Sequence, residues 1–152
     1  MLVHELARQG APDDVAIIDH DRRFTYREFD EAVTNCRDRL HAAGIKMGDR
    51  AGIFSRNSAE YVFAYFGIAS LGAIAVPINF QLSNREIAFI IKDAGIKFLM
   101  TNEPLNLVDA MAQLRCDIKV RQIDIRTCGR KKEGLPPAPP LPGTFDEHHP
   151  CA

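Results

Sequence analysis

Apolar residues recur along the chain with two spacings, which predict strands and helices in turn. Residues 15–19 form a short apolar run, and the polar residues 19–21 can turn the chain so that residues 22–24 pair with it as a β-hairpin. From residue 49 to about residue 125, short apolar runs alternate with segments whose apolar residues recur every three or four positions. This alternation is typical of an open, mostly parallel sheet with helices on its faces. The pattern therefore predicts an α/β fold that begins with a β-hairpin.

Two helices are marked at both ends by residues that can cap them. Thr25 with Glu28, and Ser83 with Glu86, have the spacing of a capping box, in which a hydroxyl and a carboxylate bond the first backbone N–H groups of a helix. Each predicted helix is followed by a glycine that can adopt the left-handed conformation: Gly44 and Gly95. Cys36 falls on the apolar face of the first helix, so we expect it in the core.

The other elements are predicted from apolar runs and single capping residues. We expect Asn57 to cap a buried helix over residues 58–71, with Glu60 completing a box. A further helix is expected over residues 103–114. Further strands are expected over residues 49–54, 73–76, 97–100 and 118–123. The strands around Ile53, Ala75 and Leu99 are expected to be parallel, because they do not alternate between apolar and polar residues.

Residues 61–80 contain no charged side chain, and a run of this length could span a bilayer. Small and polar residues and a proline interrupt it, however, so the prediction is a buried helix, a tight turn at Gly72 and a buried strand. After residue 125 the chain becomes charged and then proline-rich, which favours an extended connector. We therefore divide the chain into an α/β subdomain, residues 1–125, and a connector, residues 126–152. A proline-rich ligand for another domain is the alternative for the second part.

Composition excludes some classes of function. The 152 residues carry a formal net charge of −1, so no basic excess is available for general binding to nucleic acid. The four cysteines form no CxxC pair, and their scatter indicates a reducing compartment. The first residues lack the basic leader and apolar run of a signal peptide. We therefore expect a cytoplasmic protein.

Few residues suggest chemistry. Gly129 and Gly134 have part of a phosphate-loop spacing, but the Lys-Ser/Thr pair that should follow is absent. Two adjacent histidines and a nearby cysteine, residues 148–151, lack the four converging ligands of a zinc site. Residues 55–57, Ser-Arg-Asn, follow a predicted strand, where parallel sheets bind ligands, but Asn57 is expected to cap a helix instead. The residues themselves therefore predict no catalytic, cofactor-binding or metal-binding side chain.

Four segments resemble motifs of the adenylate-forming enzymes, in that family's order and with its approximate spacing. They are Phe-Thr-Tyr-Arg-Glu-Phe at residues 24–29, Gly-Ile-Lys-Met-Gly-Asp-Arg at residues 44–50, the polar Ser-Arg-Asn-Ser at residues 55–58, and Leu-Gly-Ala-Ile-Ala-Val-Pro-Ile-Asn at residues 71–79. The asparagine that ends the last segment is more similar to acyl-CoA synthetases than to peptide-synthetase adenylation domains. The chain thus resembles the N-terminal subdomain of an acyl-CoA synthetase, over about residues 6–101.

The resemblance implies a chemistry that these residues do not supply. Family members join a carboxylate to ATP with Mg²⁺ and then pass the acyl group to coenzyme A, as fatty-acid-activating ligases do. Their Ser/Thr/Gly-rich ATP loop and catalytic lysine have no counterpart here, and residues 145–152 resemble the segment just before that loop. The expectation is an N-terminal fragment that binds no cofactor and is inactive alone. The alternatives are a noncatalytic interaction module, which associates with itself or with the rest of the enzyme, and a fragment of an amino-acid or aryl-acid adenylating enzyme.

Overall fold

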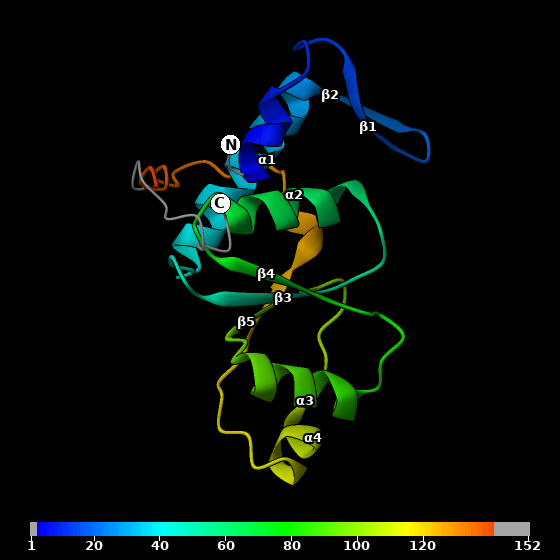
Figure 1. Cartoon of the computed structure of the whole chain (residues 1–152), viewed down its shortest axis with the longest axis vertical. Helices are drawn as coiled ribbons and strands as arrows, with labels where there is room; N and C mark the ends of the chain where they lie inside the picture. The colour runs from blue at the N-terminus through cyan, green and yellow to red at the C-terminus, as the bar shows by residue number, and fades with distance from the viewer. Residues whose placement is uncertain (1–2, 142–152) are drawn as a thin grey trace.

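The computed structural model describes residues 3–141, and within them two groups of helices cover the two faces of a parallel sheet (Figure 1). The sheet has the strand order β4-β3-β5-β6, and every neighbouring pair is parallel. Its strands are β3 (Arg50–Phe54), β4 (Ile74–Ile78), β5 (Phe98–Thr101) and β6 (Arg121–Asp124). The predicted parallel order of the first three strands is confirmed.

The helices and the hairpin lie outside this sheet. On one face are the 3₁₀ turn η1 (Val3–Arg8), α1 (Tyr26–Ala42) and α2 (Ala59–Ala69), and on the other are α3 (Asn84–Ala94) and α4 (Val108–Gln113). The hairpin β1 (Val15–Asp19) and β2 (Arg22–Thr25) is antiparallel, as expected, and forms a separate small sheet. A second 3₁₀ turn, η2 (Ile125–Thr127), follows β6. The α/β class and the initial hairpin are therefore confirmed.

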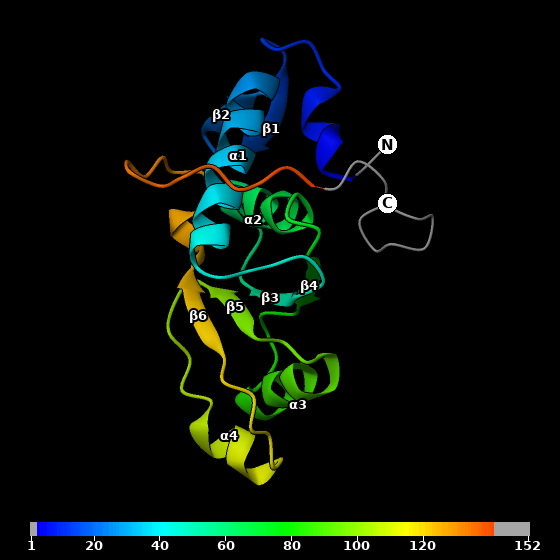
Figure 2. The same cartoon turned by 90° about the vertical axis from the view of Figure 1, so that its left-hand side faces the viewer.

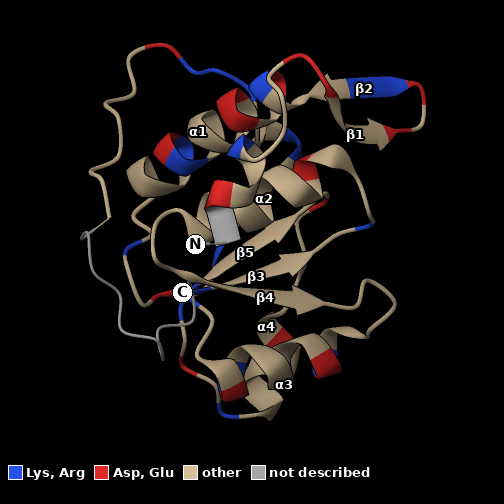
Figure 3. Ribbon diagram, turned by 45° about the horizontal axis from the view of Figure 1, so that its top comes forward, with Lys and Arg blue, Asp and Glu red and all other residues tan. Residues whose placement is uncertain are grey.

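Successive side chains along each strand point to opposite faces of the sheet, so the core has two parts. Ala51, Ile53 and Met100 are fully buried on the side of α1 and α2. Leu99 points to the opposite side and packs with α3. Gly52 shares that side, and a Cβ at this position would meet the side chain of Leu99 at 3.0 Å. Charged residues lie mainly on the outer faces of the helices and in loops, whereas β3, β4 and β5 carry few (Figure 3).

The capping predictions hold for α1 and α3. The Thr25 hydroxyl accepts a hydrogen bond from the backbone of Glu28, whose carboxylate accepts one from the backbone of Thr25. Ser83 and Glu86 make the same reciprocal pair at the start of α3. Gly44 and Gly95 both have positive φ angles, of 100° and 66°, at the ends of these helices. Cys36 is fully buried on α1, as expected.

Two predicted helices needed correction. Asn57 does not cap α2: the cap is Ser58, whose hydroxyl accepts the Tyr61 N–H at 3.1 Å, and the helix is shorter than residues 58–71. The helix expected over residues 103–114 forms only at Val108–Gln113. Residues 104–107 before it form neither helix nor strand, and the Gln122 side chain bonds both the N–H and the carbonyl of Leu105 there.

The segment after η2 has neither helix nor strand as far as residue 141, and it runs across α1 (Figure 2). The Asp38 carboxylate accepts a hydrogen bond from the backbone N–H of Ala138, which is 6% exposed. Asn35 on the same helix donates to the Gly129 carbonyl. The extended segment is thus attached to α1, and the division of the chain at residue 125 stays a prediction. Among the described residues, no helix is long and apolar enough to cross a membrane.

Candidate functional site

The carboxyl ends of the parallel strands meet at one edge of the sheet. Phe54 on β3 is in register with Thr101 on β5, and Thr101 is in register with Asp124 on β6. Residues that follow these three positions are therefore close in space although they are far apart in the sequence. This edge is where open α/β sheets bind ligands, so it is the first place to look for a functional site.

Ser55 and Asn102 meet at this edge. The Ser55 side chain is largely buried, and its Oγ lies 2.6 Å from Oδ1 of Asn102 and 3.0 Å from the backbone carbonyl of Arg56. A hydroxyl has one proton to donate, so it bonds one of these acceptors at a time. No basic side chain is among its hydrogen-bond partners within the described residues. The pair therefore fixes the loops after β3 and β5 rather than forming an activated nucleophile.

Next to this pair is a cavity of about 280 Å³, which Thr101, Asn102, Pro104, Gln122, Ile123, Asp124 and Arg126 line. Its charges compensate one another. The Arg126 guanidinium donates to both Asp124 oxygens, at 2.9 and 3.0 Å, and also lies 3.5 Å from Glu103. The hydrogen bond from Arg126 lowers the pKa of the Asp124 carboxyl, so this carboxylate is a weaker base than an ordinary aspartate.

The three residues of the Ser-Arg-Asn segment thus have different surroundings and do not act together. Ser55 bonds Asn102, the Arg56 guanidinium lies over the Phe80 ring at 5.4 Å, and Asn57 is exposed without capping α2. The sequence did not single out Asn102 or the charged residues of β6 and η2. The available signal in the sequence was that these residues follow predicted strands. Which of them lie close together, however, depends on which strands are neighbours and on their register.

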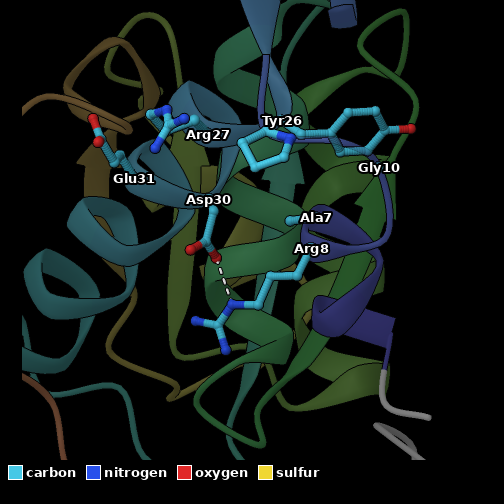
Figure 4. A pocket seen from close by; sticks show the side chains of 8 residues that line it. Ala7, Arg8, Gly10, Tyr26, Arg27, Asp30 and Glu31 are labelled. Atoms are coloured by element: carbon cyan, nitrogen blue, oxygen red, sulfur yellow. Dashed lines mark hydrogen bonds and ion pairs between the residues drawn. The ribbon is translucent and has the colours of Figure 1, made fainter. Parts of the chain in front are cut away.

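A second cavity, of about 290 Å³, lies between η1 and the start of α1 (Figure 4). Arg8 and Asp30 form an ion pair across it at 2.8 Å. Arg27 lines the same cavity and pairs with Asp13 at 3.0 Å. Glu31 also lines the cavity, so two arginines face two carboxylates there and the cavity presents no excess charge to a ligand. Within the described residues, no three His, Cys, Asp or Glu side chains form a cluster able to hold a metal. The histidines of residues 148–149 lie outside the described residues.

The family profile of AMP-binding enzymes matches residues 4–151. The chain belongs to this family. A long-chain-fatty-acid–CoA ligase, FadD13, of Mycobacterium tuberculosis is 40% identical over 84 residues, which are 55% of this chain and 17% of that protein. The 4-hydroxybutyrate–CoA ligase 2 of Metallosphaera sedula is 32% identical over 120 residues, which are 78% of this chain and 22% of the ligase.

A solved structure confirms the fold assignment. O-succinylbenzoate coenzyme A synthetase (MenE) from Bacillus subtilis, in complex with ATP and magnesium ion, superimposes with a TM-score of 0.71 at 28% identity. The match covers 85% of this chain and 34% of that chain. The AMP-binding family member described here thus has the fold of the N-terminal subdomain of adenylate-forming enzymes. It spans about one fifth of the length of the two curated ligases, at 17% and 22%.

Proposed function

We propose that this chain is the N-terminal part of an ATP-dependent, AMP-forming acyl-CoA ligase. In the whole enzyme, a carboxylate would attack the α-phosphate of ATP, and coenzyme A would then displace AMP to give the thioester. The observation that supports this most strongly is the family match, which extends over residues 4–151, nearly all of the chain. The two curated relatives are both acid–CoA ligases, although their acids differ.

The role of this part is structural. The family-like segments fall on residues that fold the chain: Thr25 caps α1, Gly44 ends it, and Gly72 turns the chain into β4 with a φ of 67°. Among the described residues, the carboxyl edge of the sheet offers paired charges and a serine without a base. We infer that ATP, Mg²⁺ and coenzyme A are held by other parts of the enzyme, and that this chain is inactive alone.

An exchange assay tests both parts of the proposal. The chain alone should give no carboxylate-dependent exchange of pyrophosphate into ATP, with fatty, hydroxy, aryl and amino acids as trial substrates. A chimera in which this chain replaces the corresponding residues of the 4-hydroxybutyrate–CoA ligase should regain exchange. Exchange by the chain alone would contradict its inactivity, and a folded chimera without exchange would contradict its role in the ligase.

The substrate class and cellular context are also proposals. Similarity to fatty-acid and 4-hydroxybutyrate ligases favours an aliphatic carboxylate, and hence a place in fatty acid metabolism. Similarity to an o-succinylbenzoate synthetase favours an aryl acid as the alternative. The acid panel of the exchange assay separates them when it is applied to the chimera. Scattered cysteines support a cytoplasmic location, which fractionation of expressing cells would test.

A second candidate is a noncatalytic module that binds the rest of the enzyme or itself. The observation in its favour is apolar surface: β4 is an edge strand, and Phe89 and Val108 are 58% and 73% exposed on α3 and α4. Exposed apolar residues favour association where they form a continuous patch. Sedimentation should then detect a dimer that Phe89→Ser weakens, and a monomer at all accessible concentrations would argue against self-association.

A further inference from the structure

A third cavity, of about 260 Å³, is lined by three cationic side chains from distant parts of the chain. Arg39 comes from the last turns of α1, Arg121 from the start of β6, and Lys132 from the segment that follows η2. Figure 2 shows β6 and that segment beside the carboxyl end of α1. The lining contains no aspartate or glutamate, and Glu133, next to Lys132 in the chain, does not contribute to it. The cavity therefore differs from the two described above, in which acidic side chains balance the arginines.

Within residues 3–141, these cations have no carboxylate partner. Every ion pair found among the described residues involves other arginines, lysines or histidines. Arg39 donates through Nη2 to the carbonyl of Arg130 at 3.1 Å, and Arg121 donates through Nη1 to the carbonyl of Ala43 at 2.8 Å. Each guanidinium has five N–H donors, so both keep donors for another acceptor.

A structural explanation covers part of this arrangement. Arginines near the carboxyl end of a helix offset the partial negative charge of its last carbonyls, which accounts for the Arg121 contact with Ala43. It does not account for Lys132, which bonds none of those carbonyls. The Nε of Arg39 is buried without a hydrogen-bond partner among the described residues, so it is shielded from a ligand in the cavity, and the Nη groups of Arg39 are the donors that remain to bind one.

We propose that this cavity binds a diphosphate-type oxyanion. Guanidinium groups match phosphate oxygens in geometry and charge, and a lysine adds a third positive charge. The diphosphate can be free or carried on a nucleoside. This inference does not depend on the proposed ligase activity, because it is argued from the unpaired cations of this cavity and not from the family match.

Isothermal titration of the 152-residue chain with pyrophosphate and with ADP, at constant ionic strength, tests the proposal. We expect saturable binding at one site. Lys132→Gln should weaken it about fivefold, which is what one exposed ion pair contributes. Lys132 is exposed and makes no ion pair, so the variant should fold, and circular dichroism checks this. Arg85→Gln is the matched control: it removes one exposed, unpaired cation from α3 on the other face of the sheet, and affinity should change less than twofold.

The two ligands separate the sources of the diphosphate. Equal affinity for pyrophosphate and ADP indicates that the site recognises the diphosphate alone, whereas clearly tighter binding of ADP indicates that the nucleoside is also bound. Either result supports the site if Lys132→Gln weakens it. Absence of saturable binding by both ligands overturns the proposal. Equal losses in the Lys132 and Arg85 variants also overturn it, since they would indicate general attraction to positive charge.

Discussion

Replacing Ser58 by alanine should destabilise the chain by removing the side-chain cap of α2. The Ser58 hydroxyl accepts the Tyr61 N–H at 3.1 Å, and loss of such a cap costs about 1 kcal/mol. The Asp19 carboxylate accepts the neighbouring Ala59 N–H at 3.0 Å, so the helix end keeps one acceptor in the variant. We therefore expect the free energy of unfolding to fall by about 1 kcal/mol rather than by the upper value of about 2 kcal/mol. In a chain of this size, that loss lowers the melting temperature by about 2–4 °C.

Urea unfolding followed by circular dichroism measures the effect, and Asn57→Ala is the matched control. Asn57 is exposed and makes no cap, so its replacement should change stability by less than about 0.5 kcal/mol. The slope of unfolding free energy against urea should stay the same in both variants, because neither changes the buried surface appreciably. An equal or larger loss in the Asn57 variant would refute the assignment of the cap to Ser58.

Three further predictions concern other contacts. The Ala59 N–H and Arg22 lower the pKa of the Asp19 carboxyl, so its contribution to stability is present above pH 5 and lost as the pH falls toward its folded pKa. In the Asp19→Asn variant, the free energy of unfolding measured with urea should therefore depend less on pH between about 5 and 3. The same dependence on pH in the variant and the parent chain would contradict this. In the same assay, Gly95→Ala should lower the free energy of unfolding more than Gly134→Ala. A positive φ costs either alanine about 1–2 kcal/mol. A Cβ at Gly95 would also lie 2.5 Å from Nη2 of Arg50 and displace a side chain that donates to the carbonyls of Gly48 and Ala94. Burial raises the pKa of the Cys36 thiol, so in a variant that keeps only Cys36 and Cys128 a thiol reagent should react only when the fold opens, and the labelling rate should rise with urea. Labelling whose rate does not depend on urea would contradict this.

Local signals were enough to locate the helices whose caps are close in sequence. Thr25 and Ser83 each find their partner three residues away, so no tertiary information is needed. The choice between Asn57 and Ser58 was different, because both residue types can cap a helix and the backbone angles decide between them. Ser58 has the extended φ and ψ, −162° and 168°, that the capping position requires.

Long-range contacts explain what the sequence did not predict. The Gln122 side chain bonds the backbone of Leu105, within the segment that was expected to be helical, although the two residues are 17 positions apart. Ser55 and Asn102 are 47 residues apart and meet because β3 and β5 are neighbours. The basic cavity depends on the path of the segment after η2, which composition alone describes as a connector. A single sequence therefore did not predict which strands are neighbours, how they are in register, or which path the loops take.

The position of β3 has a consequence for synthesis on the ribosome. β3 is translated before the other three strands of its sheet, yet it lies between β4 and β5. A sheet that forms during translation therefore grows outward from its oldest strand, first on one side with β4 and then on the other with β5 and β6. Until β5 emerges, one edge of β3 has no partner, and unpaired strand edges are prone to aggregate. Slow translation just before residue 98 would prolong that exposure, so codon choice there should affect the yield of folded protein.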